Sequence, residues 1–367
     1  MQTVGRLLLF SLVSAAAVAV AHEGHNSGGL ATGKVDLKSA GPLAFGPDGV
    51  LFVGDSLDAS VVAINTGDKG AKKSSPAEIK GINEKIAALL GTSADEILIN
   101  DAVVSPNSGR VYLSVSRGRG PDAVPVILRA DSAGKIEELK LDNVAHAKAA
   151  LPNVPAAGAK DSRGRDLRVD AITDIEFIDG HVIIAGLSNE EFSSKLRSVA
   201  YPFAKVESGT SVEIYHGNHG RYETNSPVRT FVGYNIEGKP HILAAYTCTP
   251  LVKFQLSDLT PGKKVVGTTI AELGNMNRPL DMIVYKKGST DHILMNNSAR
   301  GVMKMSTQGI EKYEAITARV AQTAGLPYET LGELKGVQQL DRWDDANAML
   351  LVKNDSGSMD IRALALP

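Results

Sequence analysis

The chain contains few aromatic residues and almost no cysteine or tryptophan. Aromatic residues make up 5% of the 367 residues, with one cysteine (Cys248) and one tryptophan (Trp343). A single cysteine excludes an intramolecular disulfide, a zinc site built from cysteine pairs and haem c attachment through a CxxCH motif. A single tryptophan argues against propellers that repeat this residue in every blade, such as WD40 proteins.

An excess of charge of one sign is also lacking. The 39 lysine and arginine residues nearly balance the 41 aspartate and glutamate residues, which leaves a formal charge of −2. Binding to nucleic acid is therefore not expected, because no surplus of positive charge can neutralise phosphates. No P-loop or dinucleotide fingerprint occurs, so no nucleotide cofactor is indicated. The Gly-x-Ser-x-Gly elbow that presents a serine nucleophile does not occur either. Glycine is plentiful, at 36 residues, which favours a turn-rich fold.

Residues 1–21 have the features of a secretory signal. Arg6 precedes an apolar stretch, and Ala19 and Ala21 supply the small residues of a cleavage site. No second apolar run is long enough to cross a bilayer. We therefore predict export to a bacterial periplasm or the cell exterior, no transmembrane segment after cleavage, and a flexible amino-terminal tail over 22–38.

Cleavage after Ala21 would place His22 at the new terminus, three residues before His25. A free α-amine beside an imidazole chelates Cu(II), because this metal favours nitrogen ligands. This arrangement raises the hypothesis of a periplasmic copper-handling protein. The alternative is a polar tail that begins with histidine by coincidence.

One pattern recurs along the chain: a short apolar strand, a turn with glycine, aspartate or asparagine, a second apolar strand, and a polar loop before a third. The first strands of its six copies begin near Pro42, Asp101, Asp174, Thr230, Asp281 and Gln338. Short strands rich in Val, Ile and Leu at this spacing predict an all-β fold, a six-bladed β-propeller of four-stranded blades over 39–367. The long interval between Asp101 and Asp174 leaves a seventh blade open.

Insertions interrupt the repeat. Apolar residues at helical spacing over 76–90, closed by Gly91, predict one amphipathic helix. Residues 143–168 are rich in Ala, Pro and Gly and predict a long surface loop. Within 311–331, a second helix is expected around 313–324. All belong to one domain, because propeller blades cannot bury their faces separately.

The segment 41–55 resembles an NHL repeat, with the sequence Gly-Pro-Leu-Ala-Phe-Gly-Pro-Asp-Gly-Val-Leu-Phe-Val-Gly-Asp. The blade pattern as a whole resembles six-bladed propellers of the NHL and SMP-30-like superfamily. NHL propellers are mostly binding scaffolds, so the resemblance implies recognition of a ligand or partner. SMP-30-like lactonases hold a divalent cation in the channel with a glutamate just before the first strand, asparagines and an aspartate. This chain has Ser39-Ala40-Gly41-Pro42 at that place, without the acid.

Three aspartates, Asp101, Asp174 and Asp281, occupy equivalent positions in three blades. The start of each innermost strand faces the central channel, so we expect these carboxylates to converge on one rim. Carboxylates close together repel one another unless a cation or protons neutralise them. The sequence therefore predicts a site for a divalent metal ion such as Ca²⁺. The alternative is that each aspartate caps its own turn through backbone N–H groups.

The densest polar cluster is His216-Gly-Asn-His219-Gly-Arg-Tyr-Glu223. Two imidazoles and a carboxylate are sufficient ligands for Zn²⁺, Cu²⁺ or Fe²⁺, and the flanking glycines indicate a loop. We predict a metal site formed by His216, His219 and Glu223, against the alternative of a hydrogen-bonded insertion that shapes the channel mouth. Cys248, at the end of an apolar run, is interpreted as a buried and inert thiol.

Two loops carry paired arginines, Arg117 with Arg119 and Arg163 with Arg165. Arginine side chains beside glycine-exposed amides can hold a carboxylate or a phosphate, so these four are candidate ligand-binding residues. Salt bridges to neighbouring aspartates such as Asp161 are the alternative.

These observations favour a binding protein over an enzyme. We predict an exported propeller that recognises a small molecule or a protein partner at one channel mouth, with a divalent metal (Ca, Zn or Cu) as a candidate cofactor. The competing hypothesis is a metal-dependent hydrolase or lactonase of the SMP-30-like type, in which an Asp–His–Glu site activates water. Copper handling is a third hypothesis, and a Ser–His–Asp triad built from distant residues stays open.

Overall fold

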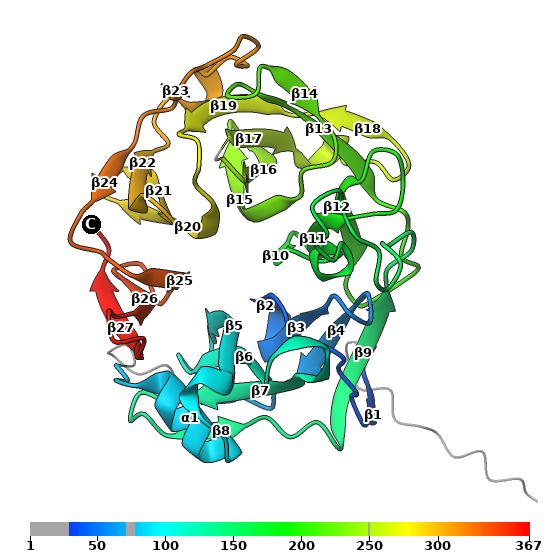
Figure 1. Cartoon of the computed structure of the whole chain (residues 1–367), viewed down its shortest axis with the longest axis vertical. Coiled ribbons are helices and arrows are strands. Elements are labelled where there is room, and N and C mark those ends of the chain that lie inside the picture. Colours follow the sequence, from blue (N-terminus) through cyan, green and yellow to red (C-terminus); the bar gives the residue numbers. More distant parts are fainter. Residues whose placement is uncertain (1–28, 71–77, 249) are drawn as a thin grey trace, which may run out of the picture.

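Six β-sheets surround a central channel in the computed structural model, which describes residues 29–70, 78–248 and 250–367 (Figure 1). Each sheet is one blade, and its innermost strand lines the channel. This arrangement confirms the prediction of an all-β propeller with six blades. The interval between Asp101 and Asp174 contains outer strands and loops instead of a seventh blade. Among the described residues, no helix combines the length and apolarity needed to cross a membrane.

We number the blades by the position of their innermost strands in the sequence and give their strands from the channel outwards. Blade 1 comprises β2 (Leu43–Phe45), β3 (Val50–Asp55), β4 (Ser60–Asn65), β9 (Val144–Ala150) and β1 (Ala31–Gly33). Blade 2 comprises β5 (Ile97–Val104), β6 (Val111–Arg117), β7 (Val124–Ala130) and β8 (Ile136–Glu138). Blade 3 comprises β10 (Asp174–Ile178), β11 (His181–Leu187), β12 (Ser194–Ala200) and β13 (Thr210–His216), and β13 also pairs with β14 (Arg221–Glu223) and β18 (Lys264–Val266).

The other three blades follow in sequence. Blade 4 comprises β15 (Val228–Ile236), β16 (Lys239–Tyr246), β17 (Pro250–Gln255), β19 (Thr268–Leu273) and β23 (Thr323–Gly325). Blade 5 comprises β20 (Pro279–Lys287), β21 (Thr290–Asn297), β22 (Gly301–Ser306) and β24 (Glu329–Leu331). Blade 6 comprises β25 (Val337–Arg342), β26 (Asn347–Lys353) and β27 (Met359–Ala365). The described residues include one α-helix, α1 (Ile82–Leu90), and short 3₁₀ turns at Pro47–Gly49, Ala94–Glu96, Gly120–Asp122, Arg168–Asp170, Leu256–Asp258 and Ile310–Lys312.

The second strand of each blade is rich in buried apolar residues. All six residues of β3 are buried, and β11 is buried from Val182 to Leu187. Short continuous apolar runs of this kind are typical of strands that are covered on both faces. Here the neighbouring blades cover them, so the apolar core lies between blades and leaves the centre of the ring to polar side chains.

The order of the blades around the ring differs from their order in the sequence. Blade 1 lies between blades 2 and 3, and blade 2 contacts blade 6, so the ring runs 2–1–3–4–5–6 (Figure 1). The chain leaves blade 1 after β4, builds blade 2 on one side, and returns with β9 to complete blade 1 before it enters blade 3. The prediction of a surface loop over 143–168 is therefore wrong for β9. This alanine-rich strand has little apolar pattern of its own, and backbone pairing with β4 and β1 places it.

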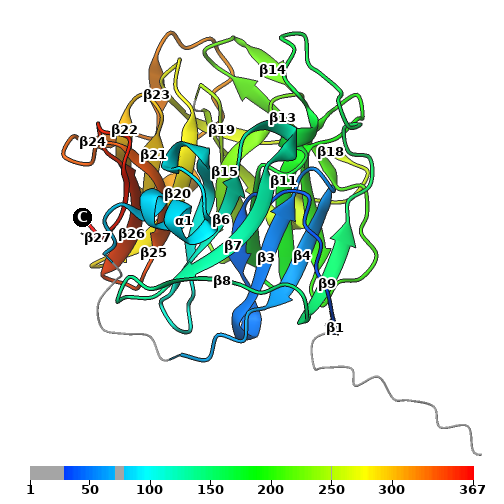
Figure 2. The same cartoon turned by 60° about the horizontal axis from the view of Figure 1, so that its bottom comes forward.

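The segment before α1 closes the ring. Ile79 exchanges two backbone hydrogen bonds with Ile361 of β27, at 2.9 and 2.8 Å, and so takes the position of a fourth strand in blade 6. The side chain of Asn83 accepts a hydrogen bond from the Met359 amide (2.8 Å). Ile82 is fully buried among apolar residues of blades 2 and 6. Figure 2 shows α1 on the outside of the ring, where it bridges these two blades.

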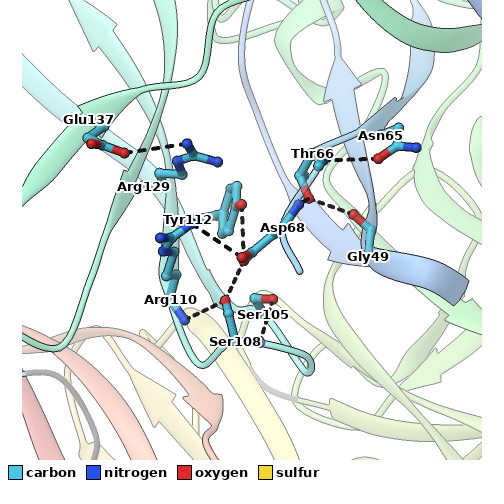
Figure 3. A network of polar contacts seen from close by, with 11 residues as sticks. Gly49, Asn65, Thr66, Asp68, Ser105, Ser108, Arg110, Tyr112, Arg129 and Glu137 are labelled. Atoms are coloured by element: carbon cyan, nitrogen blue, oxygen red, sulfur yellow. Dashed lines mark hydrogen bonds and ion pairs between the residues drawn. The ribbon is translucent and has the colours of Figure 1, made fainter. Parts of the chain in front are cut away.

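A buried polar network joins blade 1 to blade 2 where the chain leaves β4 (Figure 3). The side chain of Asp68 has no exposed area and pairs with Arg110 (3.3 Å). Asp68 also accepts hydrogen bonds from Ser108 and from the hydroxyl of Tyr112 (3.3 Å). A buried charge is tolerated only when it is paired and hydrogen-bonded, so this carboxylate holds the blade 2 residues in one position against blade 1.

Two expectations about helices also differ from the structure. The helix predicted over 76–90 begins only at Ile82, because the residues just before it pair with blade 6. No helix forms within 313–324, because Lys253 donates to the carbonyls of Ile310, Glu311 and Tyr313, and β23 then extends along β19.

The described part of the predicted amino-terminal tail contains a strand. The tail expected over 22–38 includes β1, which pairs with β9. The predicted signal at 1–21 and the His22 to His25 motif lie outside the described residues.

Replacing Ile82 by alanine should lower the free energy of unfolding by about 2–5 kcal/mol, because it leaves a cavity in the contact that closes the ring. Urea unfolding followed by the fluorescence of Trp343 measures the effect, since this tryptophan lies in the same cluster. Leu89→Ala, at a position 48% exposed on the same helix, is the control and should change stability by less than about 0.5 kcal/mol. Equal stability of the two variants would contradict a closing role for α1.

Candidate functional site

The innermost strands of all six blades line one central cavity of about 680 Å³, here called the channel. This volume lies within the range of small-molecule sites. A second hollow of about 350 Å³, here called the mouth, opens beside the channel. The two share Gly41, Pro42, Asn100, Thr173 and Arg229.

β-Bulges in four innermost strands determine which side chains reach these hollows. The pairing with the second strand shifts register at Asn100, Arg229, Leu280 and Gln338. A bulge adds one residue outside the ladder and re-aims the side chains around it. Arg229 is itself a bulged residue, and Asp101 and Asp281 each follow a bulge directly. The repeat in the sequence gives the aligned positions but not these bulges.

The structure brings together the three aspartates that were predicted to converge. Asp101, Asp174 and Asp281 all line the channel, and each lies close enough to another to influence its ionisation. Three further carboxyl groups, of Glu176, Asp341 and Asp344, line the channel as well. Glu176 lies two residues after Asp174, and side chains two apart on a strand point to the same side. This two-residue period is the signal in the sequence that would have found it.

Four of the channel aspartates each link two blades. One oxygen of Asp101 accepts a hydrogen bond from the Ala102 amide (2.8 Å), and the other accepts one from the Leu43 amide of blade 1 (2.7 Å). The same pair of bonds recurs at Asp174, Asp281 and Asp341, whose second oxygens accept the amides of Phe231, Leu340 and Val104. The alternative that each aspartate caps its own turn thus accounts for one of its two hydrogen bonds. The other hydrogen bond comes from the next blade.

Burial governs the charge of these carboxyl groups. It raises the pKa of Asp101 to about 7 and that of Glu176 to about 7. Burial, together with the charge of Asp101, raises the pKa of Asp174 and of Asp281 well above the usual value. The amide hydrogen bonds oppose these shifts without cancelling them. At neutral pH the channel wall therefore carries both protonated and ionised carboxyl groups, which can donate and accept hydrogen bonds.

Two arginines line the mouth. Arg229 donates to Asp170 (2.8 Å) and has a side chain that is 10% exposed. Arg278 lies beside it, and its guanidinium has no hydrogen-bond partner among the described residues. Burial, followed by the positive charge of Arg229, lowers the pKa of Arg278. Because only Asp170 balances the two guanidinium groups there, the mouth carries positive charge.

The four arginines predicted as ligand-binding residues line neither the channel nor the mouth. Arg117 donates to the carbonyl of Leu90 at the end of α1. Arg119 donates to the carbonyl of Asp95, which lies between α1 and β5. Arg165 pairs with Asp161 (2.6 Å), and Arg163 is exposed. Their part in ligand binding stays a prediction. The arginines at the mouth were missed, because a bulge and a loop between blades place them.

The turn after β13 brings two histidines together. The rings of His216 and His219 have centroids 3.9 Å apart. Their Nδ1 atoms lie 3.1 and 2.6 Å from the two oxygens of Glu223. Behind the turn, the buried carboxylate of Glu272 accepts a hydrogen bond from the Gly217 amide. The hairpin of β13 and β14 thus fixes both imidazoles.

Glu223 orients these rings through their Nδ1 atoms. Burial opposes ionisation of Glu223, but the hydrogen bonds from His216 and His219 outweigh it and hold its pKa well below the usual value. An ionised Glu223 accepts hydrogen bonds from both Nδ1 atoms, which leaves the Nε2 lone pairs available. The Nε2 atom of His216 is buried and has no hydrogen-bond partner in the described parts of the chain. Glu223 therefore contacts the Nδ1 side of both imidazoles, which leaves their Nε2 side for another partner.

Cys248 joins the two histidines. One ring nitrogen of each histidine and Sγ of Cys248 all lie within 4.8 Å of one another. Cys248 lies in the turn between β16 and β17, is half-buried, and has a φ of +64°, which is uncommon for any residue but glycine. The interpretation of Cys248 as buried is therefore corrected to half-buried, and its inertness stays a prediction. Sequence reasoning missed the contact because Cys248 and His216 belong to different blades.

The His216, His219 and Cys248 cluster lies on the same face as the mouth. Thr247 accepts a hydrogen bond from Nε of Arg229 (3.3 Å). The Cys248 amide donates to the carbonyl of Asn277 (2.7 Å), the residue just before Arg278. The two features are thus connected through a short path of backbone and side-chain bonds.

Comparison with known proteins gives structural likenesses only. No protein-family model matches the chain, and no curated protein matches its sequence. The fold is similar to a PQQ-bound aldose sugar dehydrogenase from Streptomyces coelicolor, at 14% identity and a TM-score of 0.37, over 91% of this chain and 96% of that one. It is also similar to a GH43 endo-arabinanase from Bacillus licheniformis, at 11% identity and a TM-score of 0.37, over 74% of this chain and 95% of that one. Likenesses at this level carry no argument about activity or ligand.

Proposed function

We propose that this propeller binds a small molecule that places a carboxylate or phosphate group at the mouth and hydroxyl groups in the channel. The observation that carries the proposal is the guanidinium of Arg278, which lines the mouth without a hydrogen-bond partner among the described residues. Arg278 is exposed, so its guanidinium is open to solvent, and an anionic group that enters the mouth would pair with it in place of water.

The charge at the mouth supports an anionic group. Arg229 already pairs with Asp170, so the charge of Arg278 is the one left to balance. Arginine presents a planar fork of donors that matches carboxylate and phosphate oxygens. A bound anion would also relieve the repulsion between the two guanidinium groups.

The channel supports a part of the ligand that is neutral and rich in hydroxyl groups. Its carboxyl groups can accept hydrogen bonds when ionised and donate them when protonated. An anionic group would be repelled there, since Asp101, Asp174 and Asp281 lie together. The two hollows therefore select opposite ends of one ligand.

Binding needs fewer assumptions than metal-dependent hydrolysis in the channel. Each aspartate oxygen described above already accepts one backbone amide, and a catalytic cation would have to share these oxygens. The resemblance to NHL propellers also supports a binding role. Export to a periplasm or the cell exterior, supported by the signal features of 1–21, is part of the proposal.

Gluconate and inorganic phosphate should bind to the purified protein more tightly than glucose does, and Arg278→Gln should weaken the binding of both anions by about 10- to 100-fold. The reason is the loss of a charge-assisted hydrogen bond at the mouth. Isothermal titration calorimetry at low ionic strength measures the affinities, with the thermal unfolding of each variant as a check on folding.

Arg163→Gln is the matched control, because it removes an exposed arginine outside both hollows. This variant should bind as the unchanged protein does. Glucose binding as tight as gluconate binding, or an Arg278→Gln variant with unchanged affinity for the anions, would contradict the proposal.

The same carboxyl groups should make the protein less stable as the pH rises from about 4.5 to about 7. Between these values the folded chain keeps protons that the unfolded chain has lost, so unfolding becomes easier with rising pH. Glu176→Gln should remove part of this loss, at most about 3 kcal/mol, because glutamine keeps the acceptor for the Gly233 amide but does not titrate.

Urea unfolding at pH 5 and at pH 8 measures this effect. The variant should be more stable than the unchanged protein at pH 8, with a smaller difference at pH 5. Glu207→Gln, at an exposed position, should leave the profile unaltered. An identical pH profile for Glu176→Gln and the unchanged protein would show that Glu176 titrates as it does in water.

A further inference from the structure

Three side chains from two blades direct ligand atoms at one point. His216 ends β13 of blade 3, His219 lies in the turn that follows, and Cys248 comes from the β16–β17 turn of blade 4. One nitrogen of each imidazole and the cysteine Sγ lie within 4.8 Å of one another. A metal ion bound by imidazole nitrogen and thiolate sulfur lies about 2.0–2.3 Å from each ligand atom, so ligand atoms within 4.8 Å of one another are close to the spacing of a single site.

The availability of Nε2 is the second observation. Glu223 occupies the Nδ1 atoms of both histidines, so coordination through Nε2 would leave these hydrogen bonds intact. The Nε2 atom of His216 is buried without a hydrogen-bond partner among the described residues, and the whole side chain is 3% exposed. Buried polar atoms almost always have a partner, and a metal ion would provide one.

The backbone of Cys248 is the third observation. A φ of +64° is unfavourable for cysteine, and strained residues of this kind cluster at functional sites. The hydrogen bond from the Cys248 amide to Asn277 holds the turn in this conformation (2.7 Å). The cysteine is thus held beside the two imidazoles at a cost in backbone energy.

We propose that His216, His219 and Cys248 bind one copper or zinc ion through Nε2, Nε2 and Sγ, with Glu223 as the residue that positions both imidazoles. Thiolate and imidazole ligands suit these metals, whereas Ca²⁺ and Mg²⁺ take oxygen ligands. The thiol proton passes to solvent as the ion binds. Because His219 is exposed and Cys248 half-buried, the ion keeps one side open for a fourth ligand.

This site is independent of the ligand proposed for the channel. It uses none of the residues that line the channel or the mouth, although it lies on the same face. It also differs from the ligand set expected from the sequence, since cysteine takes the place that Glu223 was expected to fill. Failure of anion binding at Arg278 would leave the metal proposal untouched, and the reverse holds as well.

Metal analysis of the full chain tests the proposal directly. After incubation with Zn²⁺ or Cu²⁺ and removal of free metal, the protein should retain one ion per chain at this site. Cys248→Ser and His219→Gln should each lower the retained metal by one equivalent. His181→Ala, at the start of β11 in blade 3, is the matched control and should retain the full amount.

The single cysteine provides a readout that does not depend on stoichiometry. Ellman's reagent reports only on Cys248 in this chain. Zn²⁺ should slow its reaction by at least about 10-fold, since a coordinated thiolate is withheld from the reagent. The protection should disappear in His219→Gln and persist in His181→Ala, and unchanged thermal unfolding of these variants shows that the fold is intact.

Glu223→Gln separates positioning from coordination. If Glu223 only orients the imidazoles, this variant should still bind one ion but about 10- to 100-fold more weakly. Loss of all binding, equal to that of Cys248→Ser, would make Glu223 a ligand and contradict the assignment.

The amino-terminal histidines need a separate arm. His22→Ala with His25→Ala in the full chain should leave the equivalent at Cys248 in place. Metal that is lost in this double variant and retained in Cys248→Ser would overturn the proposal. An unchanged rate of Cys248 modification in the presence of Zn²⁺ and of copper would also overturn it.

Discussion

Hydrogen bonds from the backbone amides of one blade to the carboxyl groups of the next hold the centre of this ring together. Asp101, Asp174, Asp281 and Asp341 each use both oxygens, one for their own strand and one for a neighbouring blade. Innermost strands need such links, because the apolar core lies further out, between the blades. The arrangement concentrates carboxyl groups in one channel. Burial then raises their pKa values, and without this rise all of them would be ionised at neutral pH. The chemistry of the channel thus follows from the way the ring is joined.

The repeat in the sequence was sufficient to predict the architecture and part of the channel. Aligning the six copies placed Asp101, Asp174 and Asp281 at equivalent positions, and a periodic fold must bring equivalent positions to the same radius. Extending the alignment by the two-residue period of a strand would have added Glu176. These inferences work because they depend on local pattern and on symmetry.

The other features depend on contacts between distant segments, which a single sequence does not reveal. The position of blade 1 between blades 2 and 3 follows from the pairing of β9 with β4, although β9 has a composition typical of a loop. The bulge at Arg229 changes which side chains reach the mouth. Cys248 lies beside His216 because the turns of two blades meet. In each case backbone pairing or the packing of blades decides the outcome, and local residue preference does not.

The face that carries the mouth also carries the His216, His219 and Cys248 cluster. Short connections through Thr247 and Asn277 tie the two together, so the proposed anion and the proposed metal would bind side by side. The opposite end of blades 1 and 2 is occupied by the Asp68 network, which is fully bonded and serves the fold. The Asp68 network and the two proposed binding sites thus lie at opposite faces of the ring.

The central claim is that the channel carboxyl groups face one shared space, in which burial raises their pKa values. A titration of the side-chain carboxyl carbons by NMR tests this claim most directly, because it follows each group as it loses its proton. The account predicts that Asp101 and Glu176 titrate near pH 7 and that Asp174 and Asp281 titrate well above the usual range for aspartate. Titration of all four groups near pH 4 would show that water separates them, and it would contradict the account.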